Sequence, residues 1–276
     1  MHASEFAFTP DWRLIFKSCP YSMQVRVELK KEFYKKRREA LRRKLRKKDK
    51  QIDLKEHVRN FQEYLKACIQ ASGVDRQEII QGRKEILANI LSRTNVGSLT
   101  KDDIIEILHY SWATDAWSDY PQKAMDVLDR NGLPRIRREL KKLLYGKDNL
   151  DKRFDNFNLN IKGIGAQYIS EILAFTFPQK CVLWNRAAAD VSIFLGINIL
   201  LPRETWMHRM KLDGKNYVKC CQVLGTVRDE MIESGLERSD FVDVYHFMLF
   251  LRDGLKKQPG VLEEVRYFSK QNSGWV

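Results

Sequence analysis

The chain has 276 residues, 43% of them hydrophobic, and a formal net charge of +13 at pH 7. These values are typical of a globular protein with a sizeable core. The longest apolar runs, such as residues 247–251, are far shorter than the roughly 20 residues of a membrane span, and no basic-then-apolar leader opens the chain. We therefore expect an intracellular protein, cytoplasmic or nucleoid-associated, with no membrane partner.

Most of the positive charge lies near the start of the chain. Residues 30–50 contain thirteen Lys or Arg and three acids, so a net charge of +10 falls within 21 residues. Apolar residues recur about every four positions there, which predicts a basic helix with one thin apolar stripe. Such runs usually bind nucleic acid and less often an anionic membrane. We expect a DNA-binding arm within residues 1–53, with contacts from Arg37, Arg38, Arg42 and Arg43.

The rest of the chain shows helical periodicity and almost no strand-like alternation. Thr100 followed by Asp103 predicts an N-cap, and Ser239 is a second expected cap. We predict an all-α domain over residues 54–276, with a short extended piece near 22–27 outside it. The expected helices are 54–72, 78–91, 102–110, 122–130, 134–144, 150–157, 166–175, 186–195, 215–234 and 240–255.

Metal-binding patterns are missing from the sequence. The cysteines form no CxxC pair, and the histidines show no HxxxH spacing. We therefore expect reduced, partly buried thiols and no catalytic metal.

The segment "IKGIGAQ", residues 161–167, places two glycines between two predicted helices. Glycine permits positive φ and lets another molecule approach the backbone amides, which here adjoin the N-terminus of the second helix. A plain helix-to-helix turn explains the glycines as well. The basic run and the adjacent Lys162 favour a contact with a DNA phosphate. Such a contact holds the DNA backbone and does not depend on the base sequence.

Residues 161–185, "IKGIGAQYISEILAFTFPQKCVLWN", resemble the helix-hairpin-helix superfamily of DNA glycosylases. The resemblance implies a two-lobed helical fold with the hairpin motif at about 150–176, binding to double-stranded DNA, and a monomer. It also implies that the hairpin carbonyls can hold a monovalent cation. The DNA contacts it implies are Lys162, Gly163, Ile164, Gly165, Ala166 and Gln167.

Two positions depart from the family pattern. Gln167 stands where bifunctional members have a lysine, and Asn185 stands where an aspartate follows 18 residues later. An amide cannot form a Schiff base, so lyase chemistry by that route is not expected. Asn185 can hold a water molecule but cannot supply negative charge, which leaves Asp190, Asp115 or Asp119 as alternative acids.

Three tryptophans, Trp112, Trp117 and Trp184, are either core residues or walls of a pocket that stacks an extruded base. Two functions follow from these features. The first is a monofunctional glycosylase that flips and excises a damaged or modified base, with Asn185 and Asp190 as catalytic residues. The alternative is a non-catalytic module that recognises modified or distorted DNA. An RNA-binding or protein-binding helical protein is a third, less favoured interpretation.

Overall fold

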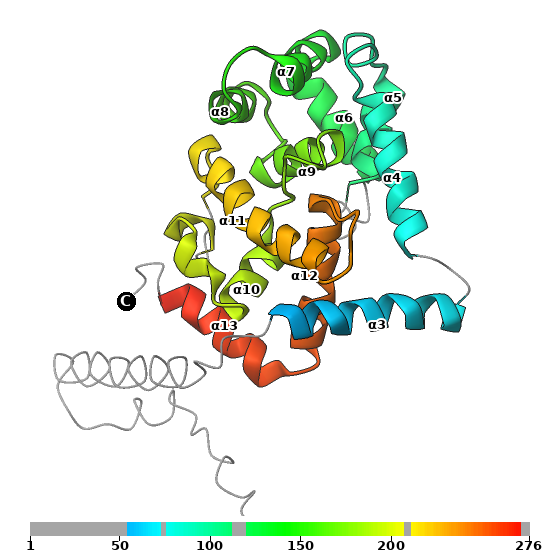
Figure 1. Cartoon of the computed structure of the whole chain (residues 1–276). Coiled ribbons are helices and arrows are strands. Elements are labelled where there is room, and N and C mark those ends of the chain that lie inside the picture. Colours follow the sequence, from blue (N-terminus) through cyan, green and yellow to red (C-terminus); the bar gives the residue numbers. More distant parts are fainter. Residues whose placement is uncertain (1–53, 73–75, 112–119, 207–210, 272–276) are drawn as a thin grey trace, which may run out of the picture. The chain divides into compact units, whose positions relative to one another are not determined.

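A computed structural model describes residues 54–72, 76–111, 120–206 and 211–271 of the chain (Figure 1). The residues from Asp53 to Val276 belong to one compact unit. The basic run at 30–50, the expected extended piece near 22–27 and the stretch 112–119 all lie outside the described residues. Four arginines predicted to contact DNA, Arg37, Arg38, Arg42 and Arg43, are therefore outside them too.

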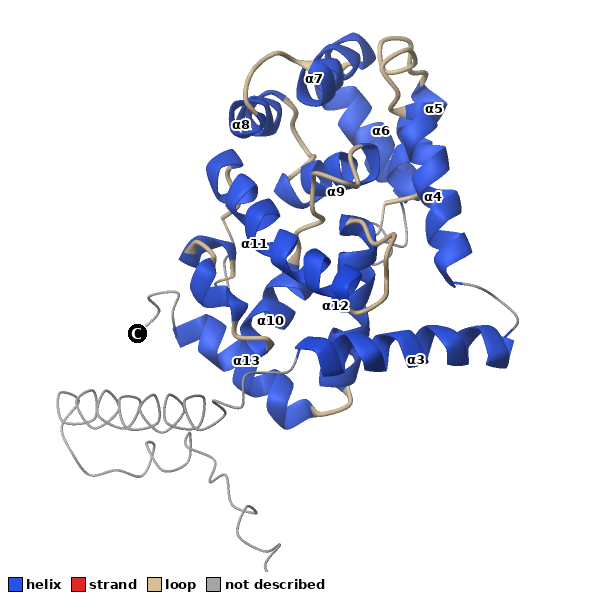
Figure 2. Cartoon of the chain, viewed as in Figure 1, coloured by secondary structure: helices blue, strands red, loops and turns tan. Residues whose placement is uncertain are grey.

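The described part of the chain is helical throughout and contains no strand, which confirms the all-α prediction for these residues (Figure 2). Two short 3₁₀ helices, η2 (Ile197–Leu200) and η3 (Arg203–Thr205), follow the helix at 186–194. The α-helices are α3 (Leu54–Ser72), α4 (Arg76–Ile90), α5 (Lys101–His109), α6 (Tyr120–Asn131), α7 (Leu133–Tyr145), α8 (Leu150–Asn160), α9 (Ala166–Thr176), α10 (Arg186–Phe194), α11 (Gly214–Glu233), α12 (Phe241–Lys256) and α13 (Pro259–Gln271).

Two helices begin with reciprocal capping boxes. Thr100 caps α5 as predicted, because its side chain accepts from the amide of Asp103 while the Asp103 carboxylate accepts from the amide of Thr100. The prediction for α12 was wrong by one residue. Asp240, not Ser239, is the N-cap, and its carboxylate accepts from the amides of Val242 and Asp243. An ionised carboxylate at this position also interacts favourably with the helix dipole.

The cap of α12 is tied to α4 by a buried cluster of charges. Lys84 is 9% exposed, and its Nζ lies 2.8 Å from Oδ2 of Asp240 and 3.3 Å from Oδ1 of Asp243. Burial raises the pKa of Asp243, and the nearby charge of Asp240 raises it further. Lys84 therefore forms ion pairs with two carboxylates that lie 156 and 159 positions later in the sequence.

Helix α9 is largely enclosed by the rest of the fold. Every residue from 168 to 175 is buried, so the helix is enclosed on all sides except at its two ends. It packs against α4, α8 and α12, and Figure 1 shows it in the interior of the helical unit. A helix so enclosed holds its N-terminus, and the turn before it, in a fixed position.

Helices α8 and α11 approach each other unusually closely at Gly214. A Cβ atom at this glycine would lie 1.9 Å from the carbonyl oxygen of Asp151, a distance that atoms cannot adopt. The amide of Gly214 donates to Asp155 on the same helix, at 2.6 Å. Glycine is therefore required at the first residue of α11 by a steric contact with α8.

Candidate nucleic-acid interface

The turn between α8 and α9, residues 161–165, is called here the glycine turn. Gly163 has φ of +87°, a conformation that side chains disfavour, and a Cβ there would lie 3.3 Å from Cγ2 of Val127. Gly165 has φ of −92° and open space around it, so its backbone does not demand glycine. The two glycines thus differ: one is required by the fold, and the other leaves room on the outside of the turn.

Burial separates the inner and outer sides of the glycine turn. Ile161 and Ile164 are 1% and 7% exposed and anchor the turn in the core. Ile164 was predicted to contact DNA as part of the hairpin; its side chain is buried, so such a contact would be made by its backbone amide. The outer side is formed by the exposed residues Lys162, Gly163 and Gly165 and by the half-buried Ala166 and Gln167.

Asn131, the last residue of α6, holds the glycine turn from within. Its side-chain amide donates to the carbonyls of Lys162 and Val127, at 2.8 and 2.7 Å. Its side-chain oxygen accepts from the amide of Lys162, at 2.8 Å. Asn131 is only 9% exposed, so these bonds are shielded from water. The backbone amide and carbonyl of Lys162 therefore both have hydrogen-bond partners, and the residue is exposed on the outer side of the turn.

Glu139 on α7 braces the end of α8 just before the turn. It is 3% exposed, its Oε1 lies 3.0 and 3.1 Å from Arg138 and Lys142, and its Oε2 accepts from Asn160 at 3.1 Å. Burial alone would raise the pKa of Glu139, but the hydrogen bonds from Arg138, Lys142 and Asn160 outweigh it and hold the pKa below its ordinary value. Glu139 is thus a buried carboxylate that joins two cations to α8.

The start of α9 is suited to an anion. Gly165 is the N-cap and supplies no side-chain hydrogen bond, so no side chain caps the first amides of the helix. The first turn of any helix leaves backbone N–H groups without intrahelical partners, and the helix dipole adds partial positive charge there. Exposed glycines beside these amides let a phosphate oxygen approach them, and Lys162 adds a full charge.

Asn185 has a structural role at the start of α10. Its side-chain oxygen accepts from the amides of Ala187 and Ala188, at 2.9 and 3.2 Å, and its amide group donates to the hydroxyl of Tyr245, at 2.5 Å. The residue is 8% exposed. Asn185 therefore caps a helix and joins it to α12, and its oxygen is already occupied by two N–H donors.

Asp190, the other predicted catalytic residue, lies one turn later in α10 and has no exposed surface. Its Oδ1 is 2.7 Å from Nη2 of Arg186, which is 27% exposed on the side-chain scale. The pair joins residues on successive turns of one helix. Asp190 is a buried carboxylate whose charge faces an intrahelical cation, although neither of its oxygens accepts a hydrogen bond of ordinary geometry.

Trp184 belongs to the core. Its side chain is 1% exposed, and its indole N–H donates to the carbonyl of Thr205 at 3.0 Å. Its backbone is held by the hydroxyl of Ser170. A base cannot stack on a ring face that the core covers, so the described structure gives Trp184 a packing role. Trp112 and Trp117 lie outside the described residues, as do Asp115 and Asp119.

A further buried carboxylate, Glu171, lies on α9, the helix that follows the glycine turn. Glu171 is 2% exposed, and the hydroxyl of Ser111 donates to its Oε2 at 2.7 Å. Tyr168, one turn earlier, has a raised pKa, mainly because it is buried and also because of the charge of Glu171. Ser111 is the last described residue before the aromatic stretch at 112–119. The sequence pattern contained no signal for this acid.

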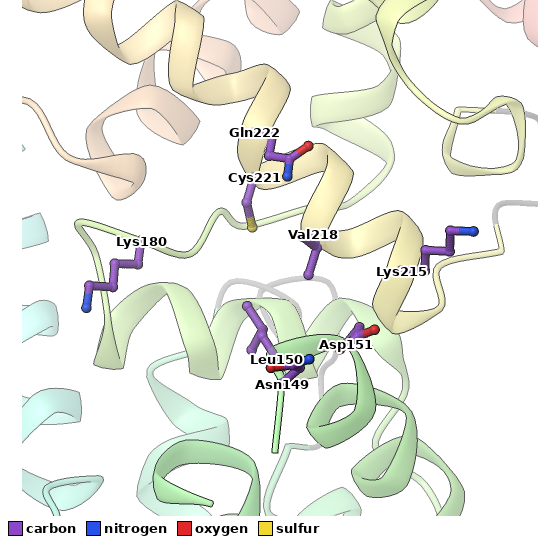
Figure 3. A pocket seen from close by; sticks show the side chains of 8 residues that line it. All are labelled: Asn149, Leu150, Asp151, Lys180, Lys215, Val218, Cys221 and Gln222. Carbon is purple, nitrogen blue, oxygen red and sulfur yellow. The ribbon is translucent and has the colours of Figure 1, made fainter. Parts of the chain in front are cut away.

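An open cavity of about 550 Å³ lies at the other end of the α8–α9 pair, beside the start of α8 and along α11 (Figure 3). Neither Asn185 nor Asp190 nor Trp184 lines it, and it has no aromatic wall. Burial raises the pKa of Cys221 to about 11, so this thiol of the cavity stays protonated at neutral pH. The lining residues are Asn149, Leu150, Asp151, Lys180, Lys215, Val218, Cys221 and Gln222.

The described residues show neither a metal-binding cluster nor a membrane-spanning helix. They contain no cluster of three or more His, Cys, Asp or Glu side chains able to hold a metal ion. None of their helices is both long and apolar enough to cross a membrane. The carbonyl of Lys162 already accepts from Asn131, so this oxygen is partly taken from any monovalent cation at the glycine turn.

Asn131, Glu139 and Glu171 were all missed by the sequence analysis. Asn131 lies 31 positions before Lys162, and Asn160 lies 21 positions after Glu139, so local patterns do not reveal either contact.

No family model matches the chain, and no curated protein or solved structure matches it significantly.

Proposed function

We propose that this protein binds double-stranded DNA, with the glycine turn and the N-terminus of α9 holding a backbone phosphate. The single observation that carries the proposal is the two-sided construction of the turn. Its inner side is satisfied by Asn131, whereas its outer side exposes Lys162, Gly163 and Gly165 next to an uncapped helix N-terminus. Rigid, exposed amides beside a lysine are suited to a phosphate oxygen.

The proposal includes a wider arrangement. We infer that α8, the glycine turn and α9 form a helix-hairpin-helix motif, with helices on either side in two lobes. The contacts support this, since α5–α8 pack in chain order and α10, α12 and α13 pack on one another, while α9 contacts members of both groups. The basic run at 30–50, with a net charge of +10, would supply further sequence-independent attraction to phosphates.

Binding without catalysis is the function that the geometry favours. The side-chain oxygen of Asn185 serves two amides, Asp190 is paired with Arg186, and neither residue lines the cavity beside α8 and α11. A water molecule that attacks a sugar needs a polar group within hydrogen-bond reach and space beside it. The DNA-binding module therefore takes precedence over the glycosylase.

Fluorescence anisotropy with a labelled duplex of arbitrary sequence tests the proposal in the full chain. Affinity for the duplex should fall steeply as salt is raised from about 50 to 200 mM, because counterions are released from each neutralised phosphate. An unlabelled DNA duplex should compete better than an RNA duplex of the same sequence, since A-form RNA presents different grooves. Preferential competition by RNA would assign the site to a different partner, and no salt-dependent binding would refute the proposal.

A glycosylase remains a second candidate because of one observation. Glu171 is a buried carboxylate on α9, the helix that begins at the glycine turn, and it could supply the negative charge that Asn185 lacks. Carboxylates in such surroundings stabilise the positive charge that develops on a sugar as the base leaves.

Duplexes bearing single altered bases, treated with alkali after incubation with the protein, test this second candidate. Strand cleavage at an altered base, lost in Glu171→Gln and kept in Asn185→Ala, would support an enzyme that uses Glu171. If no altered base yields cleavage while the duplexes are still bound, the protein is a binding module.

A further inference from the structure

Helix α7 presents a face of positive charge next to the glycine turn. Four of its cations recur at spacings of three, six and seven residues and so share one side of the helix. All four are exposed, and the only acid of the helix, Glu139, is buried beneath them. We call this the α7 basic face, formed by Arg135, Arg138, Lys141 and Lys142.

The α7 basic face is held in a fixed position relative to the glycine turn. Glu139 binds Arg138 and Lys142 through one carboxylate oxygen and Asn160, the last residue of α8, through the other. Helices α7 and α8 pack side by side, as Figure 1 shows. The glycine turn begins at the residue after Asn160, so one buried carboxylate connects the two surfaces.

The length of the α7 basic face suits a nucleic-acid backbone. Arg135 and Lys142 are separated by seven residues, or about 10 Å along the helix axis. Each DNA strand carries one phosphate per about 3.4 Å of duplex axis but winds around that axis, so consecutive phosphates lie farther apart than this and the span matches about two of them. A smaller anion would meet only part of such a row of cations.

We propose that the α7 basic face is a second phosphate-binding surface that holds the same DNA duplex as the glycine turn. This inference rests on the proposed function and adds the location of a further part of the interface. Glu139 acts as a positioning residue, because it orients Arg138 and Lys142 and stays ionised beneath them. Arg135 and Lys141 take no part in the Glu139 cluster and supply charge only.

The double variant Arg135→Gln/Lys141→Gln tests the surface without disturbing Glu139. In the full chain, log affinity plotted against log salt should become shallower by about 1.8, at about 0.9 per lost phosphate contact. Affinity should fall by a similar factor for unrelated duplex sequences, since phosphate contacts do not read bases.

A matched control removes one Arg and one Lys elsewhere. Arg266 lies on α13 and Lys257 just before it; both are exposed, and α13 packs on α10 and α12. Arg266→Gln/Lys257→Gln should therefore bind with the wild-type salt slope. The charge-preserving swap Arg135→Lys/Lys141→Arg should also retain that slope, which separates loss of charge from loss of fold.

The outcomes separate this inference from the proposed function. If wild type binds DNA with a salt-dependent affinity and Arg135→Gln/Lys141→Gln matches the control variant, the α7 basic face is not an interface, although the glycine turn can still be one. A reduced slope in that variant alone supports the inference. If the swap loses slope as well, the effect is structural and the inference fails. If wild type binds no duplex, both proposals fail.

Discussion

Gly165→Asp should stabilise the protein and weaken its binding to DNA. Gly165 is the N-cap of α9 with φ of −92° and ψ of 176°, an extended conformation that aspartate adopts readily, and nothing lies within 4 Å of the position of a Cβ. An aspartate there accepts hydrogen bonds from the first amides of α9 and interacts favourably with the helix dipole. Capping, charge and reduced freedom of the unfolded chain together should add about 1 kcal/mol to the free energy of unfolding.

The same carboxylate occupies the amides that a phosphate would use. A hydrogen bond to a charged group contributes about 1.5–3 kcal/mol, so its loss should weaken DNA binding about 10- to 100-fold. Urea denaturation measures the stability, and anisotropy with a labelled duplex measures the affinity. Gly165→Ser is the matched control, because it caps the helix without adding charge and should reduce affinity less. Equal DNA affinity of wild type and Gly165→Asp would refute a phosphate site at this turn.

Three further predictions concern the scaffold of the glycine turn and the core. Asn131→Ala removes three hydrogen bonds and should lower the free energy of unfolding by about 2–3 kcal/mol in urea denaturation. Gly214→Ala places a methyl group against the backbone of Asp151 and should cost about 3 kcal/mol, or about 6–12 °C in Tm by calorimetry. Asp243→Asn should change how stability depends on pH, because the folded-state pKa of Asp243 is raised above 3.8.

The sign of the pH effect follows from proton binding. Between 3.8 and the raised pKa, the folded protein holds the proton of Asp243 more tightly than the unfolded chain does, so wild type loses stability as pH rises through this window. Denaturation of Asp243→Asn should lack that loss, and parallel pH profiles for the two proteins would contradict it. Asn131→Asp, which sets a buried anionic oxygen against the carbonyls of Val127 and Lys162, should be less stable than Asn131→Ala. An unchanged Tm in Gly214→Ala would contradict the close approach of α8 and α11.

Helix periodicity was enough to predict most of the fold. Apolar spacing located each helix from α3 to α12, and the Thr100 capping box was predicted and confirmed. The cap of α12 was misplaced because Ser239 and Asp240 are both good caps. The amides of Val242 and Asp243, which donate to Asp240, and the amide of Asp240, which donates to Asp243, identify Asp240 as the cap. Helix α13 was not predicted, although its first residue, Pro259, is a helix-start signal.

The candidate site was harder to predict because its contacts join distant parts of the chain. The glycines of the turn could be predicted from residues 161–165 alone, since a positive φ at Gly163 is a local property. The roles of Asn131 and Glu139 depend on how α6 and α7 pack on the turn, which one sequence does not show. Asn185 was predicted to hold water; its oxygen caps α10 through two local amides, and its bond to Tyr245, 60 residues later, is the contact that no local pattern shows.

The most direct test of DNA binding by the glycine turn is an amide chemical-shift titration of the isotope-labelled full chain with a short duplex. The amide signals of Gly163, Gly165 and Ala166 should shift on adding DNA, because a phosphate oxygen would accept hydrogen bonds at this end of α9. The amide of Lys162 should shift less, since it already donates to Asn131. Binding of the duplex with no change in the signals of Gly163, Gly165 and Ala166 would contradict the proposal.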